Sequence, residues 1–298
     1  EHHPSQWERI ATVLMPKDYV NFRLCGVRAT DYSEASCYYL MDSATLQWSP
    51  EALRQFGLRA DQLPALHLSS EVIGHITPAA ASVTGLPPGV PVVAGTADMA
   101  ATLLGSGVYQ AGIASDSTGT STLLTVVSEH PLLSAGVNNL HLANSAWGGF
   151  TLLDAGGDAM RWARSALSAG QLSHQQMLDM AAEVPPGAEG LLFLPYLTGE
   201  RLAEHTNSRA QFFGLQRKHR QPHLYRAVLE GVALASLRNL QQLRRHAQEP
   251  EAMIASGGGA RSPLWLQIKA SVYNLPLLQT RNQENGTTGC AIVAGVGV

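Results

Sequence analysis

Cysteine is scarce in this sequence of 298 residues, which contains only Cys25, Cys37 and Cys290. The three are far apart and odd in number, and neither a CxxC pair nor a Cys/His spacing suited to zinc occurs. A disulfide framework and a structural zinc site are therefore excluded. Because disulfide-rich scaffolds belong to oxidising compartments, this cysteine usage predicts a cytoplasmic protein.

Charge is also scarce. Only 14% of the residues are Asp, Glu, Lys or Arg, compared with about 25% in an average soluble domain. The net charge is −3, and lysine and arginine form no run, so the electrostatic footprint of a nucleic-acid-binding protein is missing. The longest uncharged stretch near the centre, residues 99–115, is interrupted by glycines and polar residues, which excludes a membrane span there.

What the sequence does contain is hydrophobic residues, at 45%, and 28 glycines. Many small residues with few charges are typical of a layered α/β protein in which parallel strands are buried on both faces. The length predicts about two domains of ~150 residues each. The composition is thus ample for two hydrophobic cores.

The most informative stretch is residues 84–122. A Gly/Pro turn leads into a short apolar strand, and a Gly-Thr corner places one carboxylate, Asp98, at the start of a small-residue helix. After a glycine-rich joint, a second strand ends in Ser-Thr-Gly-Thr-Ser at 117–121. A lone acid at such a corner suits a general base, and a glycine flanked by hydroxyls suits phosphate oxygens. Each has a commoner alternative, a helix cap for Asp98 and an ordinary polar turn for 117–121.

Two further glycine segments precede predicted helices. Gly156-Gly157-Asp158 opens a helix over 159–169, and a strand over 253–255 is followed by three glycines at 257–259 and a helix from Pro263. Bare backbone at a helix start can hold an anion or face a flat ring, although alone it is more often a packing contact. Neither GxGxxG nor GxxxxGK[ST] is present, so a dinucleotide fingerprint and a Walker P-loop are excluded.

Two other features have structural interpretations. Asp31, in TDYSEAS, is interpreted as a helix cap in preference to a catalytic acid. A long helix is predicted from Pro222 to near His246, with one apolar stripe that indicates plain core. The stripe consists of Leu229, Val232, Ala233, Ser236, Leu237, Leu240 and Leu243.

Nine ordered segments together resemble the FGGY family of carbohydrate kinases. They are MPKDYVNFRLCG, TDYSEAS, LMDSATLQW, VVAGTADMAATLLGSG, DSTGTST, GGDAMRW, LPYLTGER, YRAVLEGVA and SGGGARSPLW, and they span essentially the whole chain. The resemblance implies an actin-like (RNase H-like) α/β fold of two domains around a cleft. It implies that residues 1–107 are the C-terminal part of a first, sugar-binding domain and that residues 108–298 are a second, nucleotide-binding domain.

The resemblance also implies an activity, which is transfer of the γ-phosphate of ATP, with Mg²⁺, to a hydroxyl of a ketopentose such as D-xylulose. Gluconate, ribulose and polyols are the alternative acceptors within the family. The partners implied are the sugar, ATP and a second copy of the chain in a homodimer, with neither nucleic acid nor membrane. An alternative from another class is a non-catalytic actin-like nucleotide-binding module, and Asp98 argues against it.

Site residues carry over from the family position by position. The catalytic, sugar-contacting aspartate corresponds to Asp98, although Thr96-Ala97 stand where many relatives have glycines. The nucleotide-binding positions correspond to Thr118, Gly119, Thr120, Gly157, Arg161, Gly258, Gly259 and Ser262, the last replacing an Asn of some relatives. The metal ligands are unassigned. The family's N-terminal phosphate-gripping hairpin and a C-terminal helix have no counterpart here, so the sequence is expected to be a fragment.

Overall fold

The structure, a computed structural model, describes residues 7–200, 207–282 and 284–298. It consists of two compact units. The first contains the chain up to Tyr109 together with Leu140–Trp147 and Glu284–Val298, and the second contains Gln110–Asn139 and Gly148–Gln283. The domain boundary predicted at residues 107 and 108 stays a prediction.

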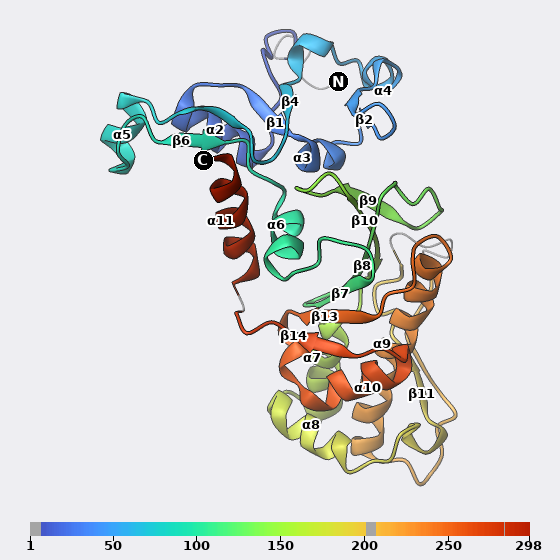
Figure 1. Ribbon diagram of the computed structural model, residues 1–298. Helices are drawn as coiled ribbons and strands as arrows, with labels where there is room; N and C mark the ends of the chain where they lie inside the picture. Colours follow the sequence, from blue (N-terminus) through green and yellow to red (C-terminus); the bar gives the residue numbers. More distant parts are fainter. Residues whose placement is uncertain (1–6, 201–206, 283) are drawn as a thin grey trace. The chain divides into compact units, whose positions relative to one another are not determined.

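A six-stranded sheet with the order β14-β13-β7-β8-β10-β9 forms the frame of the second unit (Figure 1). Its strands are β7 (Ile113–Thr118), β8 (Thr122–Ser128), β9 (Asn138–His141), β10 (Trp147–Leu153), β13 (Ala252–Ser256) and β14 (Leu277–Gln279). β13 is parallel to β7 and β14, but β7 and β8 are antiparallel. The expectation of a parallel sheet is thus only half right. Three residues, 119–121, join β7 to β8, and so short a connection permits only an antiparallel pair.

Four helices pack into one cluster beside this sheet in Figure 1, namely α7 (Gly157–Ser168), α8 (His174–Ala182), α9 (Gln221–Arg244) and α10 (Pro263–Tyr273). The long predicted helix is confirmed as α9, with Pro222 in its first turn. Its predicted stripe is core, since six of the seven residues are buried and Leu237 is partly buried. Between α8 and α9 lie the short 3-10 helix η2 (Ala188–Gly190) and the antiparallel strands β11 (Leu192–Leu194) and β12 (Gln211–Phe213). A second 3-10 helix, η3 (Gly258–Arg261), follows β13.

The first unit is built from short helices and strands, and several of the helices begin at a capping side chain. The side-chain oxygens of Ser49, Thr77 and Asp31 cap the helices that begin at Pro50, Pro78 and Tyr32, as the sequence predicts for Asp31. Its elements are α2 (Pro16–Cys25), β1 (Ala29–Asp31), α3 (Tyr32–Cys37), β2 (Met41–Asp42), β3 (Gln47–Trp48), α4 (Pro50–Phe56), η1 (Ala60–Gln62), β4 (Ala65–His67), β5 (Val72–His75), α5 (Pro78–Thr84), β6 (Pro91–Val93), α6 (Asp98–Gly105) and α11 (Asn285–Gly297).

Helices α6 and α11 touch backbone to backbone within the first unit. A Cβ added at Gly105 would overlap the carbonyl of Asn285, and one added at Gly289 would overlap the carbonyl of Ala101. Glycine at these two positions is therefore required by packing. The contact holds α6, and with it the segment that begins at Asp98, against α11.

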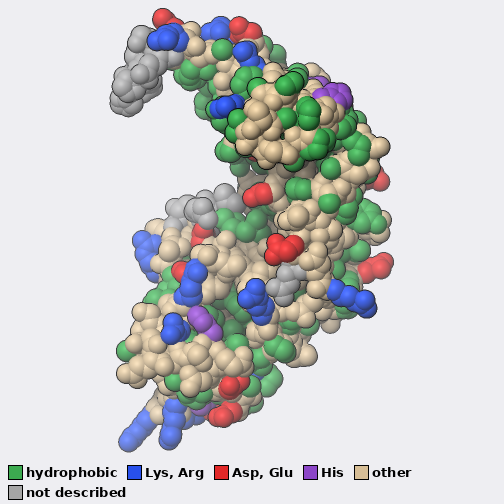
Figure 2. Space-filling model, turned by 90° about the vertical axis from the view of Figure 1, so that its left-hand side faces the viewer, with side chains coloured by type: hydrophobic (Ala, Val, Ile, Leu, Met, Phe, Trp, Pro, Cys, Tyr) green, Lys and Arg blue, Asp and Glu red, His purple; other side chains and the backbone are tan. Residues whose placement is uncertain are grey.

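Surface charge is mixed on the face shown in Figure 2, where lysine and arginine side chains alternate with acidic ones. Of the helices in the described ranges, none combines the length and the apolar character needed to cross a bilayer.

Helix α9 offers a test of this packing, because Gly231 lies directly against β11. Alanine is the better helix former by about 1 kcal/mol, yet a Cβ at Gly231 would overlap the backbone carbonyl of Phe193. We expect Gly231→Ala to lower the melting temperature, since overpacking costs about 1–3 kcal/mol. Thermal unfolding followed by circular dichroism measures this. Gln241→Ala, at an exposed position of the same helix, is the control and should melt like the unmodified protein. An unchanged or higher melting temperature for Gly231→Ala would contradict the packing described.

Candidate functional site

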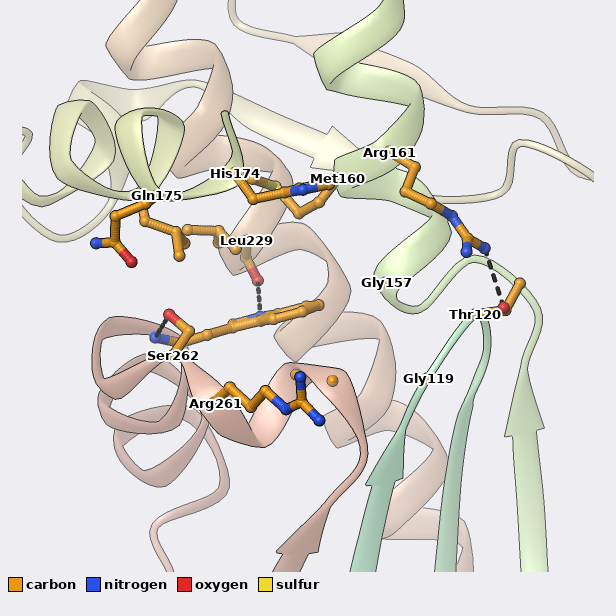
Figure 3. A pocket seen from close by; sticks show the side chains of 14 residues that line it. Gly119, Thr120, Gly157, Met160, Arg161, His174, Gln175, Leu229, Arg261 and Ser262 are labelled. Atoms are coloured by element: carbon orange, nitrogen blue, oxygen red, sulfur yellow. Dashed lines mark hydrogen bonds between the residues drawn. The ribbon is translucent and has the colours of Figure 1, made fainter. Parts of the chain in front are cut away.

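A cavity of about 550 Å³ opens in the second unit (Figure 3). The β7–β8 turn, the start of α7, the start of α8 and the start of α10 border it. Its lining residues are Gly119, Thr120, Gly157, Met160, Arg161, His174, Gln175, Leu178, Leu229, Gly258, Gly259, Arg261, Ser262 and Trp265. Gly119, Gly157 and Gly258, three of the positions that the resemblance assigns to the nucleotide, thus line one cavity.

Backbone hydrogen bonds join the β7–β8 turn to helix α7. The N–H of Gly157 donates to the carbonyl of Gly119 at 2.9 Å, and the N–H of Asp158 donates to the carbonyl of Thr120 at 3.0 Å. The Arg161 guanidinium, one turn further on, donates to the Thr120 hydroxyl at 3.0 Å and pairs with Asp158. Figure 3 shows this guanidinium reaching toward Thr120. The first N–H groups of α7 therefore hold the turn in place, while Arg161 brings positive charge to it.

The glycines around the cavity divide into two kinds. A Cβ at Gly157 would overlap the Gly119 carbonyl, and one at Gly259 would lie 2.7 Å from a methyl of Thr118. Packing within the protein therefore requires glycine at both positions. A Cβ at Gly119 or at Gly258 would meet no atom within 4 Å, and neither residue has a positive φ. Neither packing nor conformation therefore requires glycine at these two positions. The absence of a side chain there leaves open space next to the exposed backbone.

The other side of the cavity is apolar. Met160, Leu178 and Leu229 contribute aliphatic surface, and Trp265 contributes a flat ring. The ring is fixed because its indole N–H donates to the Leu229 carbonyl at 3.2 Å. Sequence reasoning missed this wall. An apolar residue on a helix behind a glycine triplet has no pattern that distinguishes it from core.

Two predicted nucleotide residues have other partners. The Ser262 hydroxyl accepts from the backbone N–H of Trp265 at 3.2 Å and so caps α10. Ser262 also lines the cavity. Thr118 is 1% exposed and does not line the cavity. Its hydroxyl instead lies in a buried cluster with Asp116 and Lys269. The remaining predicted positions all line the cavity.

Asp98 lies in the first unit, at the first position of α6, and its side chain is exposed. The N-cap is the preceding Ala97, so the cap interpretation of Asp98 is not realised. One carboxylate oxygen of Asp98 accepts from the N–H of Met99 at 2.6 Å. An acidic side chain in the first turn of a helix interacts favourably with the helix dipole. The side chain of Asp98 is thus both held at the helix start and open to solvent.

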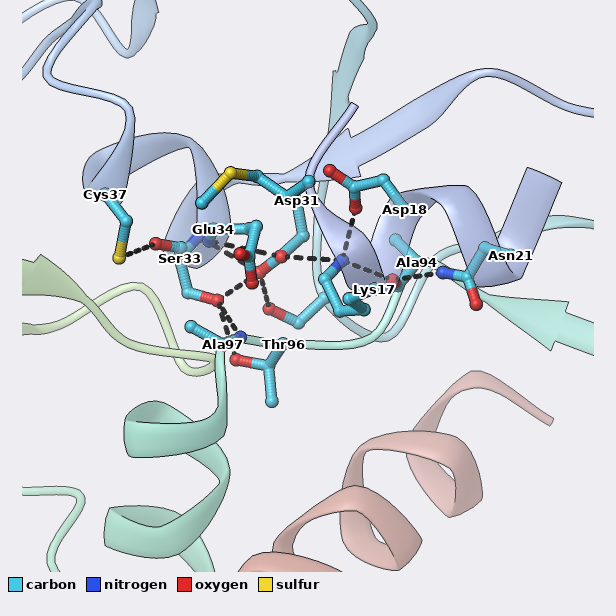
Figure 4. A network of polar contacts seen from close by, with 12 residues as sticks. Lys17, Asp18, Asn21, Asp31, Ser33, Glu34, Cys37, Ala94, Thr96 and Ala97 are labelled. Atoms are coloured by element: carbon cyan, nitrogen blue, oxygen red, sulfur yellow. Dashed lines mark hydrogen bonds and ion pairs between the residues drawn. The ribbon is translucent and has the colours of Figure 1, made fainter. Parts of the chain in front are cut away.

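A buried network supports the corner that precedes Asp98 (Figure 4). The Ser33 hydroxyl accepts from the N–H of Ala97 at 2.8 Å and lies 2.8 Å from the hydroxyl of Thr96. Asp31 in turn accepts from the Ser33 and Ser69 hydroxyls at 2.5 and 2.7 Å. The side chain of Thr96 and the backbone of Ala97 are thus part of the network.

Lys17 supplies the positive charge of this network. Its ammonium pairs with Asp18 at 2.7 Å and with Asp31 at 3.2 Å, and donates to the Ala94 carbonyl at 2.8 Å. Burial alone would lower the pKa of Lys17, but Asp31 and Asp18 raise it above its ordinary value. Burial also raises the pKa of the neighbouring Glu34 carboxyl, with Lys17 acting in the opposite direction. The sequence indicated only the cap role of Asp31, because its contacts with Lys17 and Ser69 depend on the tertiary fold.

No group of three or more His, Cys, Asp or Glu side chains able to hold a metal occurs among the residues that the structure describes. A site for Mg²⁺ does not need such a group. Mg²⁺ keeps several waters and usually binds through one or two carboxylates plus substrate phosphates. The exposed carboxylate of Asp98 fits that requirement.

Models of the FGGY family of carbohydrate kinases match nearly the whole chain, the N-terminal domain over residues 1–105 and the C-terminal domain over residues 114–298. The chain therefore belongs to this family. Its fold is accordingly the actin-like α/β fold of two domains that the sequence predicts.

Individual relatives are sugar kinases. The chain is 31% identical to a xylulose kinase of Bacillus subtilis (strain 168), covering 100% of the chain and 60% of the relative. The crystal structure of a xylulose kinase from Rhodospirillum rubrum is similar with a TM-score of 0.93 and 32% identity, over 99% of the chain and 61% of that protein. A gluconate kinase from Lactobacillus acidophilus is similar with a TM-score of 0.89 and 28% identity, over 94% of the chain and 58% of that protein. The chain thus spans about 60% of the length of the curated relatives it matches.

The end of β9, from Leu140 on, belongs to the first unit and contains a buried histidine with a testable pH effect. His141 is 3% exposed, packs against the Tyr32 and Trp147 rings, and has two ring nitrogens without a hydrogen-bond partner among the described residues. Burial lowers its pKa, a shift that Asp31 partly opposes. The folded protein thus holds the neutral ring.

The free energy of unfolding should therefore have its full value above the pKa of an unfolded histidine, about 6.5. It should decline as the pH falls below that value, because the unfolded chain then binds a proton that the folded chain does not. The contribution of His141 to this slope is at most about 1.4 kcal/mol per pH unit. Urea unfolding between pH 7.5 and 5.5 measures it. We expect His141→Phe to flatten the decline, and His246→Gln, at an exposed position, to leave it unchanged. Equal slopes for His141→Phe and the unmodified protein would contradict the assignment.

Proposed function

We propose that the protein containing this chain is an ATP-dependent sugar kinase that phosphorylates D-xylulose to D-xylulose 5-phosphate. The observation that carries the nucleotide part is the pair Gly119 and Gly258. Both line one cavity, and neither needs to be glycine for the packing of the protein itself. The sugar is inferred from relatives such as the xylulose kinase of Bacillus subtilis.

The cavity suits ATP in size and chemistry. Its volume of about 550 Å³ lies within the ~300–1,000 Å³ of small-molecule sites. Phosphates would lie at the Gly119 and Thr120 backbone, where Arg161 adds positive charge. The adenine ring would lie on the apolar wall of Met160 and Trp265. Backbone approach to phosphate and an apolar slot for a base are the two requirements of a nucleotide site.

Asp98 is the proposed general base. Its carboxylate accepts the proton of a sugar hydroxyl while that oxygen forms a bond to the γ-phosphorus. The bond between this phosphorus and the bridging oxygen breaks, and ADP leaves. The base contributes about 10²–10⁴-fold to the rate, and most of the remainder comes from positioning and charge stabilisation. The network of Lys17, Asp31 and Ser33 keeps the corner before Asp98 fixed.

Mg²⁺ is the expected metal, and it would neutralise charge on the phosphates. Among the residues of this chain, Asp98 is the proposed contact, through a water molecule. A cytoplasmic location and a homodimer complete the proposal. The first follows from the sparse cysteines, and the second remains a prediction from the resemblance alone.

Another acceptor within the family is the second candidate, and the similarity to a gluconate kinase structure favours it. Gluconate, ribulose and polyols are all acceptors for the same chemistry at Asp98. A non-catalytic nucleotide-binding module is less well supported, because such a module has no use for an exposed carboxylate held at a fixed corner.

The proposal predicts that Asp98→Asn lowers turnover by about 10²–10⁴-fold and leaves ATP affinity nearly unchanged, since the carboxylate acts on the sugar. ADP release by the full-length protein, measured with a panel of ketoses, polyols and aldonates, tests this and the substrate together. Asp61→Asn, at an exposed ion pair with Arg59, is the control. Highest kcat/KM on gluconate would favour the second candidate. Lost ATP binding with retained turnover would contradict the role of Asp98.

The two kinds of glycine give a second test. Gly258→Ala should raise the Kd for ATP by about tenfold, equivalent to 1.4 kcal/mol, and leave the melting temperature unchanged, because its methyl group enters open space. Gly259→Ala should lower the melting temperature, because its methyl group meets Thr118. Calorimetric titration with ATP and thermal unfolding measure the pair. Unchanged ATP affinity in Gly258→Ala would contradict the nucleotide site.

A further inference from the structure

A buried ion pair lies directly behind the β7–β8 turn, and the proposed chemistry makes no use of it. Asp116 of β7 and Lys269 of α10 are 1% and 3% exposed. The ammonium lies 2.8 Å from each carboxylate oxygen, and the Tyr273 hydroxyl donates to one of them at 2.9 Å. Burial, together with Asp116, raises the pKa of Tyr273 well above its ordinary value, so this hydroxyl remains a donor.

Thr118 connects the ion pair to the turn. Its hydroxyl accepts from Lys269 at 2.5 Å and donates to Asp116 at 2.6 Å. The next residue in the chain is Gly119, whose carbonyl accepts from the N–H of Gly157. The side chain of Thr118 therefore has a single orientation, and the backbone that leads into the turn is fixed with it.

Thr118 also touches the opposite glycine loop. A Cβ at Gly257 would lie 2.6 Å from the Thr118 carbonyl oxygen, and one at Gly259 would lie 2.7 Å from its methyl group. Lys269 belongs to the helix that follows this loop, and its ammonium lies 5.1 Å from the centre of the Trp265 ring. One buried cluster thus contacts both the β7–β8 turn and the loop that leads into α10.

We propose that Asp116 and Lys269 are positioning residues that fix the spacing between the β7–β8 turn and the 257–262 loop, and thereby set the affinity for ATP. This inference rests on the proposed function. Two charges withdrawn from water gain little net stability over an apolar pair of similar volume. Their directional bonds to Thr118 do supply something that an apolar pair lacks, which is a fixed position for the backbone on either side of the cavity.

If the ion pair had only a structural role, its loss would lower stability without a specific effect on ATP affinity. A second buried ion pair in the same unit distinguishes this alternative from the positioning role. Arg226 and Glu230 of α9 pair at 2.6 Å with side chains 8% and 12% exposed, and neither lines the nucleotide cavity. Arg226→Met, like Lys269→Met, leaves a buried carboxylate without its cation. The two substitutions should therefore destabilise the fold to a similar degree.

The experiment measures ATP affinity by calorimetric titration and melting temperature for the full-length protein and its variants. We expect Lys269→Met to raise the Kd for ATP at least about tenfold, because a misplacement of ~1 Å at a site can cost ~100-fold in function. Arg226→Met should change the Kd less than about twofold despite its lower melting temperature.

The double variant Asp116→Leu with Lys269→Met removes the uncompensated charge. It should regain the melting temperature while its weakened ATP affinity persists, an outcome that a structural role cannot produce. Native affinity in the double variant or in Lys269→Met would overturn this inference alone. Failure of the unmodified protein to bind ATP would overturn the nucleotide site, and this inference with it.

Discussion

The second unit depends on one close approach of backbones, where the turn after β7 meets the start of α7 and the loop after β13. The contact is possible because Gly157 and Gly257 lack side chains that would overlap Gly119 and Thr118. Peptide groups then bond directly, as the N–H of Gly157 does to the Gly119 carbonyl. Arg161 on one side of the cavity and Trp265 on the other lie on the helices that follow these segments. A rigid backbone frame is what a phosphate site requires, since its donors cannot reorganise during the reaction.

In the first unit, charged side chains hold a backbone segment in place. Residues 94–97, before Asp98, lie outside any helix or strand, and the side chains of Ser33 and Lys17 bond to their backbone. Asp31 holds both of these groups, so a residue recognised locally as a helix cap also fixes a segment more than sixty residues away. Buried carboxylates and an ammonium are costly to desolvate. Here these charges bond to the backbone and hydroxyl groups that lead up to Asp98.

Family membership and local geometry contribute differently to the functional conclusion. The family models and the similar structures establish the actin-like fold and a relationship to carbohydrate kinases. The proposed nucleotide contacts rest on the geometry of this chain, in which Gly119 and Gly258 lie beside open space. The sugar remains an inference from relatives, since the chain spans about 60% of their length.

The sequence by itself determined what depends on neighbouring residues. Asp31 was recognisable as a helix cap, α9 as a long helix with an apolar stripe, and the three glycine segments as points where backbone is exposed, because hydrogen bonding and helical period act over a few positions. Only the tertiary structure decided which segments meet. The antiparallel pairing of β7 with β8, the burial of Thr118, and the ion pair between Asp116 and Lys269, 153 positions apart, all depend on contacts distant in sequence. A single chain contains no pattern for such contacts, because any of its acidic residues could pair with any of its basic ones until the fold brings two of them together.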